Sequence, residues 1–306
     1  MSQAIELPES KYVDLGGPVH YREWDGPEGP TFVCVHGLGG SLLNWISVAP
    51  GLAKRGRVVA VDLVGFGKTP REGRSASMKD NRALLSRFLR EVTSGPVVLI
   101  GNSMGGAISM LQTALEPESV GALVLTSPAL PWTRGDRPDP TVAAAFALYQ
   151  LPGVGERFLR QRARRLGPER LVTETLALCC VDTTRVDQAV VELMVEAARE
   201  RQELPDSIPA FLQAARSLLS LSRRTRFGRE VMDRIDCPVL LIHGRQDRLV
   251  RVQTAIAVCE AHPDWRLRIF EDTGHVAQLE RPAEWLAEVE DWLDTEVNRS
   301  DMQTAS

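Results

Sequence analysis

The chain has 306 residues, of which 43% are hydrophobic and 25% charged, and its formal net charge is −4. This composition is typical of a globular protein with one large domain or a domain carrying a sizeable insertion. The net charge gives no general reason to expect nucleic acid or an anionic membrane as a partner, and no apolar run is long enough to span a bilayer.

The N-terminal sequence and the cysteines bear on the compartment. The segment "MSQAIELPESK" has neither the basic start nor the apolar core of a secretory signal. The five cysteines show no C-x-x-C and no Cys/His ligand spacing, which favours reduced thiols over a disulfide framework or a zinc site. We therefore expect a cytoplasmic protein without a metal.

Before residue 130, short apolar runs alternate with helical patterns. Strands are expected in "PVHYREWDG", "TFVCVHG", "RVVAVDLVG", "PVVLIGNS" and "GALVLTSP". Helices are expected in "MKDNRALLSRFLREV", where Leu85, Phe88, Leu89 and Val92 recur at helical spacing, and in "MGGAISMLQTALE". Continuous apolar runs separated by helices indicate an α/β fold with a mostly parallel central sheet and helices on both faces.

The pattern changes between about residues 130 and 234, where strand-like runs vanish and Arg, Ala, Leu and Glu dominate. The alternation resumes with "CPVLLIHGRQD", a helical segment near "TAIAVCEAH", the strand "WRLRIF" and a closing amphipathic helix. We therefore expect an α/β core domain of residues 1–129 and 235–297, a helical cap of residues 130–234, and a disordered tail of residues 298–306.

The segment "GNSMG" places Ser103 between Gly101 and Gly105, where an expected strand meets an expected helix. This context is that of a nucleophile elbow, in which a strained turn presents the serine Oγ at the edge of the sheet. Small flanking residues are needed because strand and helix crowd together there. The helix also directs its free N–H groups at the same spot. The alternative is a plain strand-to-helix turn with a structural serine.

A nucleophilic serine needs a base, and the base needs an orienting acid. The last two strands supply both after their ends, Asp247 in "HGRQD" and His275 in "EDTGH", in the chain order expected for such an elbow. Asp272 is the rival acid, but it is too near His275 in the chain to reach the far ring nitrogen easily. The remaining histidines outside the glycine-rich loop fit structural roles: His20, His243 and His262.

The segment "VCVHGLGGS" ends an early strand with His36 and Gly37, followed by further glycines. Backbone N–H groups are unshielded in such a loop, so the N–H of Leu38 is expected to join that of Met104 in an oxyanion hole. The alternative is a merely flexible loop at residues 37–40. Neither "GFGKT" nor "GLGGSL" completes a phosphate-binding or dinucleotide motif, because Asp62 and Leu42 stand where glycine is required. No nucleotide cofactor is implied.

Four segments together resemble the α/β-hydrolase superfamily: "HGLGGSLLNW", "DLVGFGKT", "GNSMGGA" and "GRQDRLV…TGHVAQLERP". The similarity is to its cap-bearing branch of carboxylesterases, lipases and meta-cleavage-product hydrolases. The resemblance implies a triad of Ser103, Asp247 and His275, an oxyanion hole at Leu38 and Met104, and no metal or cofactor. Supporting roles are expected for His36, Gly37, Gly101, Asn102 and Gly105. A serine at position 103 argues against dehalogenases and epoxide hydrolases, whose nucleophile is aspartate.

Substrate contacts are expected from Leu130 and Trp132, at the start of the insertion, and from Val276. For Leu130 and Trp132, packing of the cap is an equal alternative. The arginine-dense stretch "ERFLRQRARRLGPER" reads as a solvated helix face, with recruitment of anionic substrates or contact with a lipid surface as the alternative.

The expected activity is hydrolysis of a small-molecule carboxylic ester through an acyl-enzyme. One alternative is carbon–carbon hydrolysis of the meta-cleavage type; another is a ligand receptor with little turnover. The resemblance to meta-cleavage hydrolases weakens at Val276, where that family usually carries Trp. In the cap, Arg199 is the nearest candidate for the family's substrate-binding arginine, beside Glu192 and Glu196. Unpaired glutamates there would penalise a carboxylate substrate.

Overall fold

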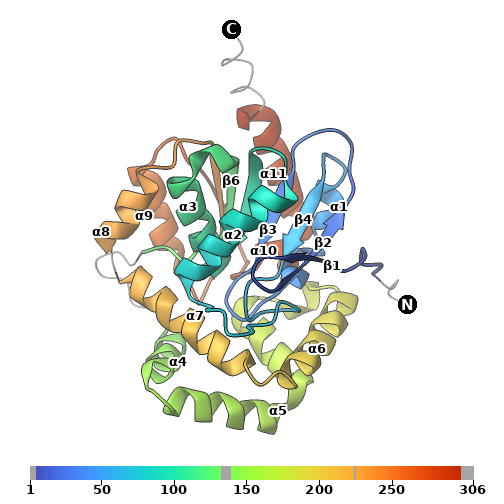
Figure 1. Ribbon diagram of the computed structural model, residues 1–306. Coiled ribbons are helices and arrows are strands. Elements are labelled where there is room, and N and C mark those ends of the chain that lie inside the picture. Colours follow the sequence, from blue (N-terminus) through green and yellow to red (C-terminus); the bar gives the residue numbers. More distant parts are fainter. Residues whose placement is uncertain (1–4, 132–138, 224, 298–306) are drawn as a thin grey trace.

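The computed structural model describes residues 5–131, 139–223 and 225–297. Within these residues the strands form one eight-stranded sheet in the order β1-β2-β4-β3-β5-β6-β7-β8. Figure 1 shows helices on both sides of the sheet and a group of helices across one end of it. The strands are β1 (Lys11–Asp14), β2 (Pro18–Trp24), β3 (Phe32–Val35), β4 (Val58–Val61), β5 (Val97–Asn102), β6 (Val120–Thr126), β7 (Val239–Gly244) and β8 (Arg266–Phe270).

The six strands from β4 to β8 in this order pair in parallel, whereas β1 and β2 form an antiparallel edge. The predicted α/β class and mostly parallel sheet are therefore confirmed. The pattern missed β1, a short and largely exposed strand. Because parallel strands share an edge for their carboxyl ends, the segments after β3, β5, β7 and β8 are brought together.

The helices cover the sheet and extend beyond it. They are η1 (Leu42–Trp45), α1 (Ala49–Leu52), α2 (Met78–Val92), α3 (Met104–Leu115), η2 (Pro117–Ser119), α4 (Pro140–Gln150), α5 (Val154–Cys179), η3 (Thr183–Arg185), α6 (Gln188–Gln202), α7 (Ser207–Ser222), α8 (Thr225–Met232), α9 (Val252–Ala261), α10 (Ala277–Glu280), α11 (Pro282–Trp292) and the π-helical turn η4 (Leu293–Val297).

Successive residues of each central strand face opposite sides of the sheet, so each strand contributes to two cores. In β3, Val33 and Val35 belong to the core beneath α2, α3 and α9, whereas Phe32 and Cys34 belong to the core beneath α1 and α11. Both sets are completely buried. This two-sided burial explains why the strands appear in the sequence as continuous apolar runs rather than as alternating ones.

Helices α4 to α8 lie between β6 and β7, and Figure 1 shows α4, α5, α6 and α7 grouped at one end of the sheet. We call α4 to α7 the cap. The cap is tied to the core where the N–H of Met78, at the start of α2, donates to Ser217 Oγ of α7 at 3.0 Å. Met232 of α8 lies in the α2–α3 core, so this last helix of the predicted 130–234 segment packs with the core. The predicted tail, 298–306, lies outside the described residues.

Candidate active site

Ser103 occupies a strained turn between β5 and α3. Its φ of 54° and ψ of −117° lie in a region that costs an L-residue on the order of 1–3 kcal/mol. Its N–H donates to the Thr126 carbonyl at 3.1 Å, as a strand residue would, and its carbonyl accepts from the Ala107 N–H at 3.1 Å, as a helix residue would. Strand and helix thus share this one residue, which is why its backbone cannot relax.

The two flanking glycines are required by close packing. A Cβ at Gly105 would stand 2.2 Å from the Val35 carbonyl oxygen of β3, and one at Gly101 would stand 2.7 Å from the Gly105 carbonyl. Neither backbone can withdraw, because each belongs to the central sheet or to the helix that follows. The glycines therefore permit the elbow geometry expected from the sequence, and the plain-turn alternative accounts for the strain at Ser103 less well.

The loop after β3 lies against the elbow. A Cβ at Gly37 would be 3.1 Å from Ser103 Cβ, so this loop passes directly beside the serine. The Gly37 carbonyl accepts from His36 Nδ1 at 2.8 Å and from the Gly40 N–H at 3.1 Å. Because a trans peptide directs its N–H opposite its carbonyl, these two bonds fix the direction of the Leu38 N–H.

His36 has a defined tautomer. The Leu63 N–H donates to its Nε2 at 3.1 Å, so Nδ1 carries the proton that is given to Gly37. Complete burial lowers the pKa of His36, which keeps the ring neutral. The second oxyanion donor expected from the sequence is Met104, the first residue of α3, whose N–H has no partner within the helix.

Asp247 and His275 meet at the same edge of the sheet. His275 Nδ1 lies 2.7 Å from Asp247 Oδ2, and the other carboxylate oxygen accepts from the N–H groups of Leu249 at 2.8 Å and Val250 at 3.0 Å. Burial alone would raise the pKa of Asp247, but the charge of His275 and hydrogen bonds from His243 and His275 outweigh it and hold the pKa well below its usual range. The carboxylate therefore stays ionised.

The rival acid is turned elsewhere. Asp272 is half-exposed and sits at a φ of 50° in the turn after β8. Its carboxylate pairs with Arg185 and lies 3.5 Å from Arg281. The carboxylate on His275 is that of Asp247, as the chain-distance argument expects.

His243 is the residue whose part the sequence argument understated. It is fully buried at the end of β7, and its Nε2 lies 3.3 Å from Asp247 Oδ2 and 2.9 Å from the Val250 carbonyl. Its Nδ1 is buried with no partner, so the proton resides on Nε2 and points at these two oxygens. Asp247 therefore lies between two histidines. The separation of four positions in "HGRQD" is the only sequence signal for this contact.

Hydrogen bonds from the cap and from the core hold the His275 loop. Its N–H donates to the Cys179 carbonyl at the end of α5, at 2.5 Å, and its own carbonyl accepts from Asn102 Nδ2 at 3.2 Å. Asn102 also donates to the Thr126 carbonyl at 3.0 Å. Asn102 thus joins the elbow to the histidine loop, a supporting role that the sequence predicted without its partner.

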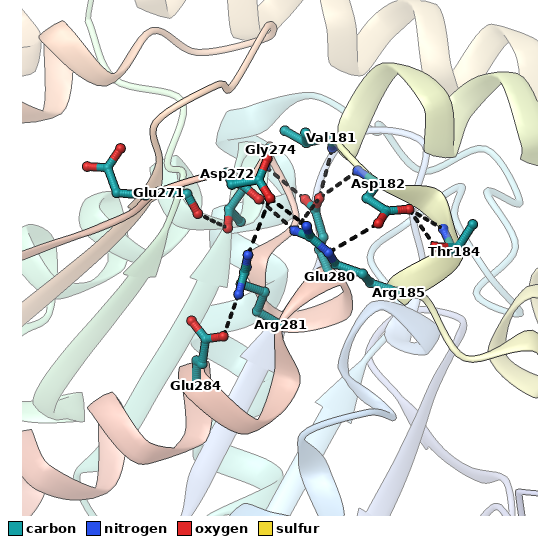
Figure 2. A network of polar contacts seen from close by, with 11 residues as sticks. Val181, Asp182, Thr184, Arg185, Glu271, Asp272, Gly274, Glu280, Arg281 and Glu284 are labelled. Atoms are coloured by element: carbon teal, nitrogen blue, oxygen red, sulfur yellow. Dashed lines mark hydrogen bonds and ion pairs between the residues drawn. The ribbon is translucent and has the colours of Figure 1, made fainter.

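A buried carboxylate strengthens the same junction, as Figure 2 shows. Glu280 of α10 has a completely buried side chain. One oxygen accepts from the N–H groups of Val181 and Asp182, each at 2.9 Å, and the other accepts from the Gly274 N–H at 2.8 Å. Arg185 completes the network by donating to the Asp272 carbonyl at 2.7 Å. We call Glu280 and the backbone groups of residues 181, 182 and 274 the cap clamp.

The predicted substrate contacts fall in different places. Leu130 is buried in the core cluster, and Val276 is buried in a cluster with Val172, Leu176 and other cap residues. Trp132 lies outside the described residues. The structure places aromatic residues of the cap beside the loop instead: a Cβ at Gly39 would lie 3.2 Å from the Phe211 ring, which packs edge-on against Tyr149.

Two further features bear on chemistry. In the ranges 5–131, 139–223 and 225–297, no cluster of three or more His, Cys, Asp or Glu side chains is arranged to hold a metal ion. Over the same ranges, no helix is both long enough and apolar enough to cross a membrane.

Comparison with known proteins agrees with this geometry. A sequence model described as alpha/beta hydrolase fold matches residues 30–282. The chain is 27% identical to a 2-hydroxy-6-oxo-6-(2'-aminophenyl)hexa-2,4-dienoic acid hydrolase of Metapseudomonas resinovorans, covering 92% of this chain and 91% of that protein. It is 24% identical to the monoacylglycerol lipase ABHD6 of Mus musculus, covering 86% and 75%. The crystal structure of the haloalkane dehalogenase DatA from Agrobacterium tumefaciens C58 superposes with a TM-score of 0.79 at 20% identity, covering 94% of this chain and 96% of that one. The chain belongs to the α/β-hydrolase fold family.

Proposed function

We propose that this protein is a serine hydrolase that cleaves carboxylic esters through an acyl-enzyme. The observation that carries the proposal is the strained elbow at Ser103, beside the oriented Leu38 N–H and at the sheet edge where Asp247 holds His275. These are the groups that acyl transfer needs: a nucleophile, a base with a fixed tautomer, and donors for an oxyanion.

In the proposed mechanism, Asp247 accepts a hydrogen bond from the Nδ1–H of His275, which leaves Nε2 as the base. Nε2 takes the Ser103 proton as Oγ attacks the ester carbonyl, and the N–H groups of Leu38 and Met104 hold the resulting oxyanion. The alcohol then leaves with the proton from His275. Water repeats the cycle on the acyl-enzyme and releases the acid, which restores Ser103.

Ser103→Ala tests the proposal directly. Hydrolysis of p-nitrophenyl esters should fall on the order of a million-fold, because residues of such a triad act as a unit. Asp247→Asn should lower kcat by about 10⁴-fold through the wrong imidazole tautomer. Asp272→Asn is the matched control and should stay near the wild-type rate. Retention of a tenth of the activity in folded Ser103→Ala protein contradicts the assignment.

Carbon–carbon hydrolysis is a second candidate, because one cap residue favours an acidic substrate. The Arg201 guanidinium of α6 lies over the Phe66 ring, 4.8 Å from its centroid, and Phe66 in turn packs edge-on against His36. Arg201 Nη2 donates to the Ser207 carbonyl at 3.3 Å, and no carboxylate of the described residues pairs with the Arg201 guanidinium. Burial lowers the pKa of Arg201 to about 10, so the cation is held close to the loop at some cost.

The penalty expected from the cap glutamates is also weaker than the sequence argument assumed. Glu196 pairs with Arg199, and Glu192 lies 3.5 Å from the Gln188 amide nitrogen. Both glutamates are exposed to solvent, so water and these partners screen them. The expectation of repulsion at a buried substrate therefore no longer separates the two reactions. The names of the two curated relatives, a dienoic acid hydrolase and a monoacylglycerol lipase, point one to each side.

A side-by-side assay separates the candidates. Ester hydrolysis as the function requires kcat/KM for a short p-nitrophenyl ester to exceed that for a phenyl-substituted dienoate diketone by at least about tenfold, or roughly 1.4 kcal/mol. Arg201→Met should leave the ester value within about threefold, because an uncharged substrate needs no cation. The reverse ranking, with a loss of diketone turnover in Arg201→Met, establishes carbon–carbon hydrolysis. Negligible turnover of both substrates favours a receptor.

A further inference from the structure

The first half of α5 carries exposed arginines and exposed apolar side chains on one face. Leu151, Val154 and Phe158 are 51%, 48% and 38% exposed, which is unusual for large apolar residues in this molecule. Arg157, Arg160, Arg164 and Arg165 are exposed among them. At 100° per residue, the helical members of this set fall within less than half of the helix circumference. We call these seven residues the arginine face.

Most of the positive charge on this face is not neutralised. Arg160 forms an ion pair with Glu156 at 2.7 Å, but no carboxylate of the described residues pairs with Arg157, Arg164 or Arg165. By contrast, Arg162 on the flank of the same helix pairs with Glu174. Arg157, Arg160 and Arg164 also line a shallow hollow of about 460 Å³, together with Gly153, Glu156 and Gln161. The surface thus offers concentrated positive charge around a depression.

The two kinds of side chain together define the partner. Guanidinium groups bind phosphate oxygens well, whereas exposed Phe, Leu and Val side chains gain free energy only in an apolar environment. An anionic bilayer offers both, with phosphate headgroups above the acyl boundary. A nucleic acid would satisfy the arginines and leave the apolar side chains in water. We propose that the arginine face docks the protein on anionic lipid bilayers as a peripheral protein.

The net charge of −4 gives this docking an orientation. A bilayer of negative surface potential repels most of a net-negative protein and attracts only a locally positive surface. The break at Gly167, whose φ of 71° and ψ of 170° are non-helical, separates the arginine face from the second half of α5. The second half of α5 ends at Cys179, whose carbonyl accepts a hydrogen bond from the His275 N–H. The helix that would touch lipid therefore continues to the candidate active site.

Vesicle sedimentation tests the inference on the whole chain. Wild-type protein should bind vesicles of phosphatidylcholine and phosphatidylglycerol in equal parts, more weakly as salt rises, and should not bind phosphatidylcholine alone. Because each basic residue near an anionic surface contributes roughly fivefold, a triple Arg157→Gln, Arg164→Gln, Arg165→Gln variant should bind on the order of a hundredfold more weakly. Phe158→Ser should also weaken binding, which charge alone does not explain.

A matched control removes the same charge from exposed positions elsewhere: Lys54→Gln, Lys79→Gln and Arg87→Gln. This variant should bind vesicles within about threefold of wild type, because its changes lie outside the arginine face. Ser103→Ala should bind like wild type, so the result does not depend on the proposed chemistry. The inference is overturned if the wild type does not bind vesicles at low salt, or if both triple variants lose binding equally. It is also overturned if the wild type binds duplex DNA more tightly than vesicles. The same holds if the arginine-face variant changes its oligomeric state but still binds vesicles.

Discussion

At the scale of single residues, Asp247 shows how a buried carboxylate is kept charged. Two backbone N–H groups bind one of its oxygens, and His275 and His243 contact the other. Without those donors, burial would favour the protonated acid, which could not stabilise an imidazolium. Of the two rings, His275 is the one that the proposed mechanism uses as the base. His243 acts through Asp247 and is a positioning residue.

Substituting His243 should change the pH dependence as well as the rate. His243→Leu removes one donor to Asp247, so the carboxylate holds the His275 proton more strongly and the base becomes available only at higher pH. We expect the acid limb of the kcat profile to move up by about 0.5–1 pH unit, with kcat lowered several-fold. His243→Gln retains an N–H donor and should restore the limb. An unshifted limb in folded His243→Leu protein contradicts the positioning role.

At the scale of elements, the cap and the histidine loop are joined through a carboxylate inside the protein. The cap clamp gathers three N–H groups, two from the segment after α5 and one from the residue before His275, onto Glu280 (Figure 2). Such a carboxylate is stable when buried because each oxygen is hydrogen-bonded. One side chain therefore helps to hold both the cap segment after α5 and the residue before His275.

Glu280→Gln should loosen both the cap segment after α5 and the His275 loop. The amide presents an N–H₂ group where an N–H donor expects an oxygen, so we expect a loss of about 2–3 kcal/mol in the free energy of unfolding. In the fraction that remains folded, kcat for a short acetate ester should fall about tenfold or more with little change in KM, because the base is misplaced rather than the substrate site.

The control for this variant is Arg185→Gln, at the exposed rim of the same network. Arg185 is 29% exposed, and it pairs with the half-exposed Asp272 and lies 3.8 Å from Glu280 without a hydrogen bond to it. Its loss keeps all three N–H donors to Glu280, so it should cost less than the loss in Glu280→Gln. Urea denaturation and steady-state kinetics on both variants provide the comparison. Normal kcat in folded Glu280→Gln protein would show that the clamp is structural only.

At the scale of the whole molecule, stability in acid should depend on His36. Burial lowers its pKa below the ordinary 6.5, so at pH below 6.5 the unfolded chain binds a proton that the folded protein does not. The contribution of His36 to stability is thus fully present above pH 6.5 and is lost as pH falls through the window between the two pKa values. This sign follows from a depressed pKa on a base.

His36→Gln should remove this part of the acid sensitivity. Between pH about 7.5 and about 5, the free energy of unfolding of wild type should fall by up to about 2 kcal/mol more than that of the variant. Urea titrations at the two pH values measure the difference, and each protein serves as its own reference. Equal falls in the two proteins contradict a buried neutral His36.

The sequence predicted the sheet and its two covered faces, because strands buried on both sides appear as continuous apolar runs. It predicted the helical segment because such runs are absent there. It also predicted that Ser103, Asp247 and His275 share one edge of the sheet, since each follows a strand end, and the structure gives the Asp247–His275 contact. It could not predict contacts made across the fold by groups without a local pattern. Arg201 over Phe66 and the partners of Glu280 depend on how distant segments pack. The backbone groups that bind Glu280 have no residue identity.

That last property has a consequence for how such caps diverge or are exchanged. The hydrogen bonds that the cap makes to Glu280 and to the His275 N–H all use main-chain atoms: the Cys179 carbonyl and the N–H groups of Val181 and Asp182. The Arg185 side chain adds an ion pair with Glu280 at 3.8 Å. Any residue except proline at positions 181 and 182 offers the same donor. A foreign cap grafted onto this core should therefore keep these hydrogen bonds to the His275 loop if it preserves the chain path at 179–182, even where most of its side chains differ.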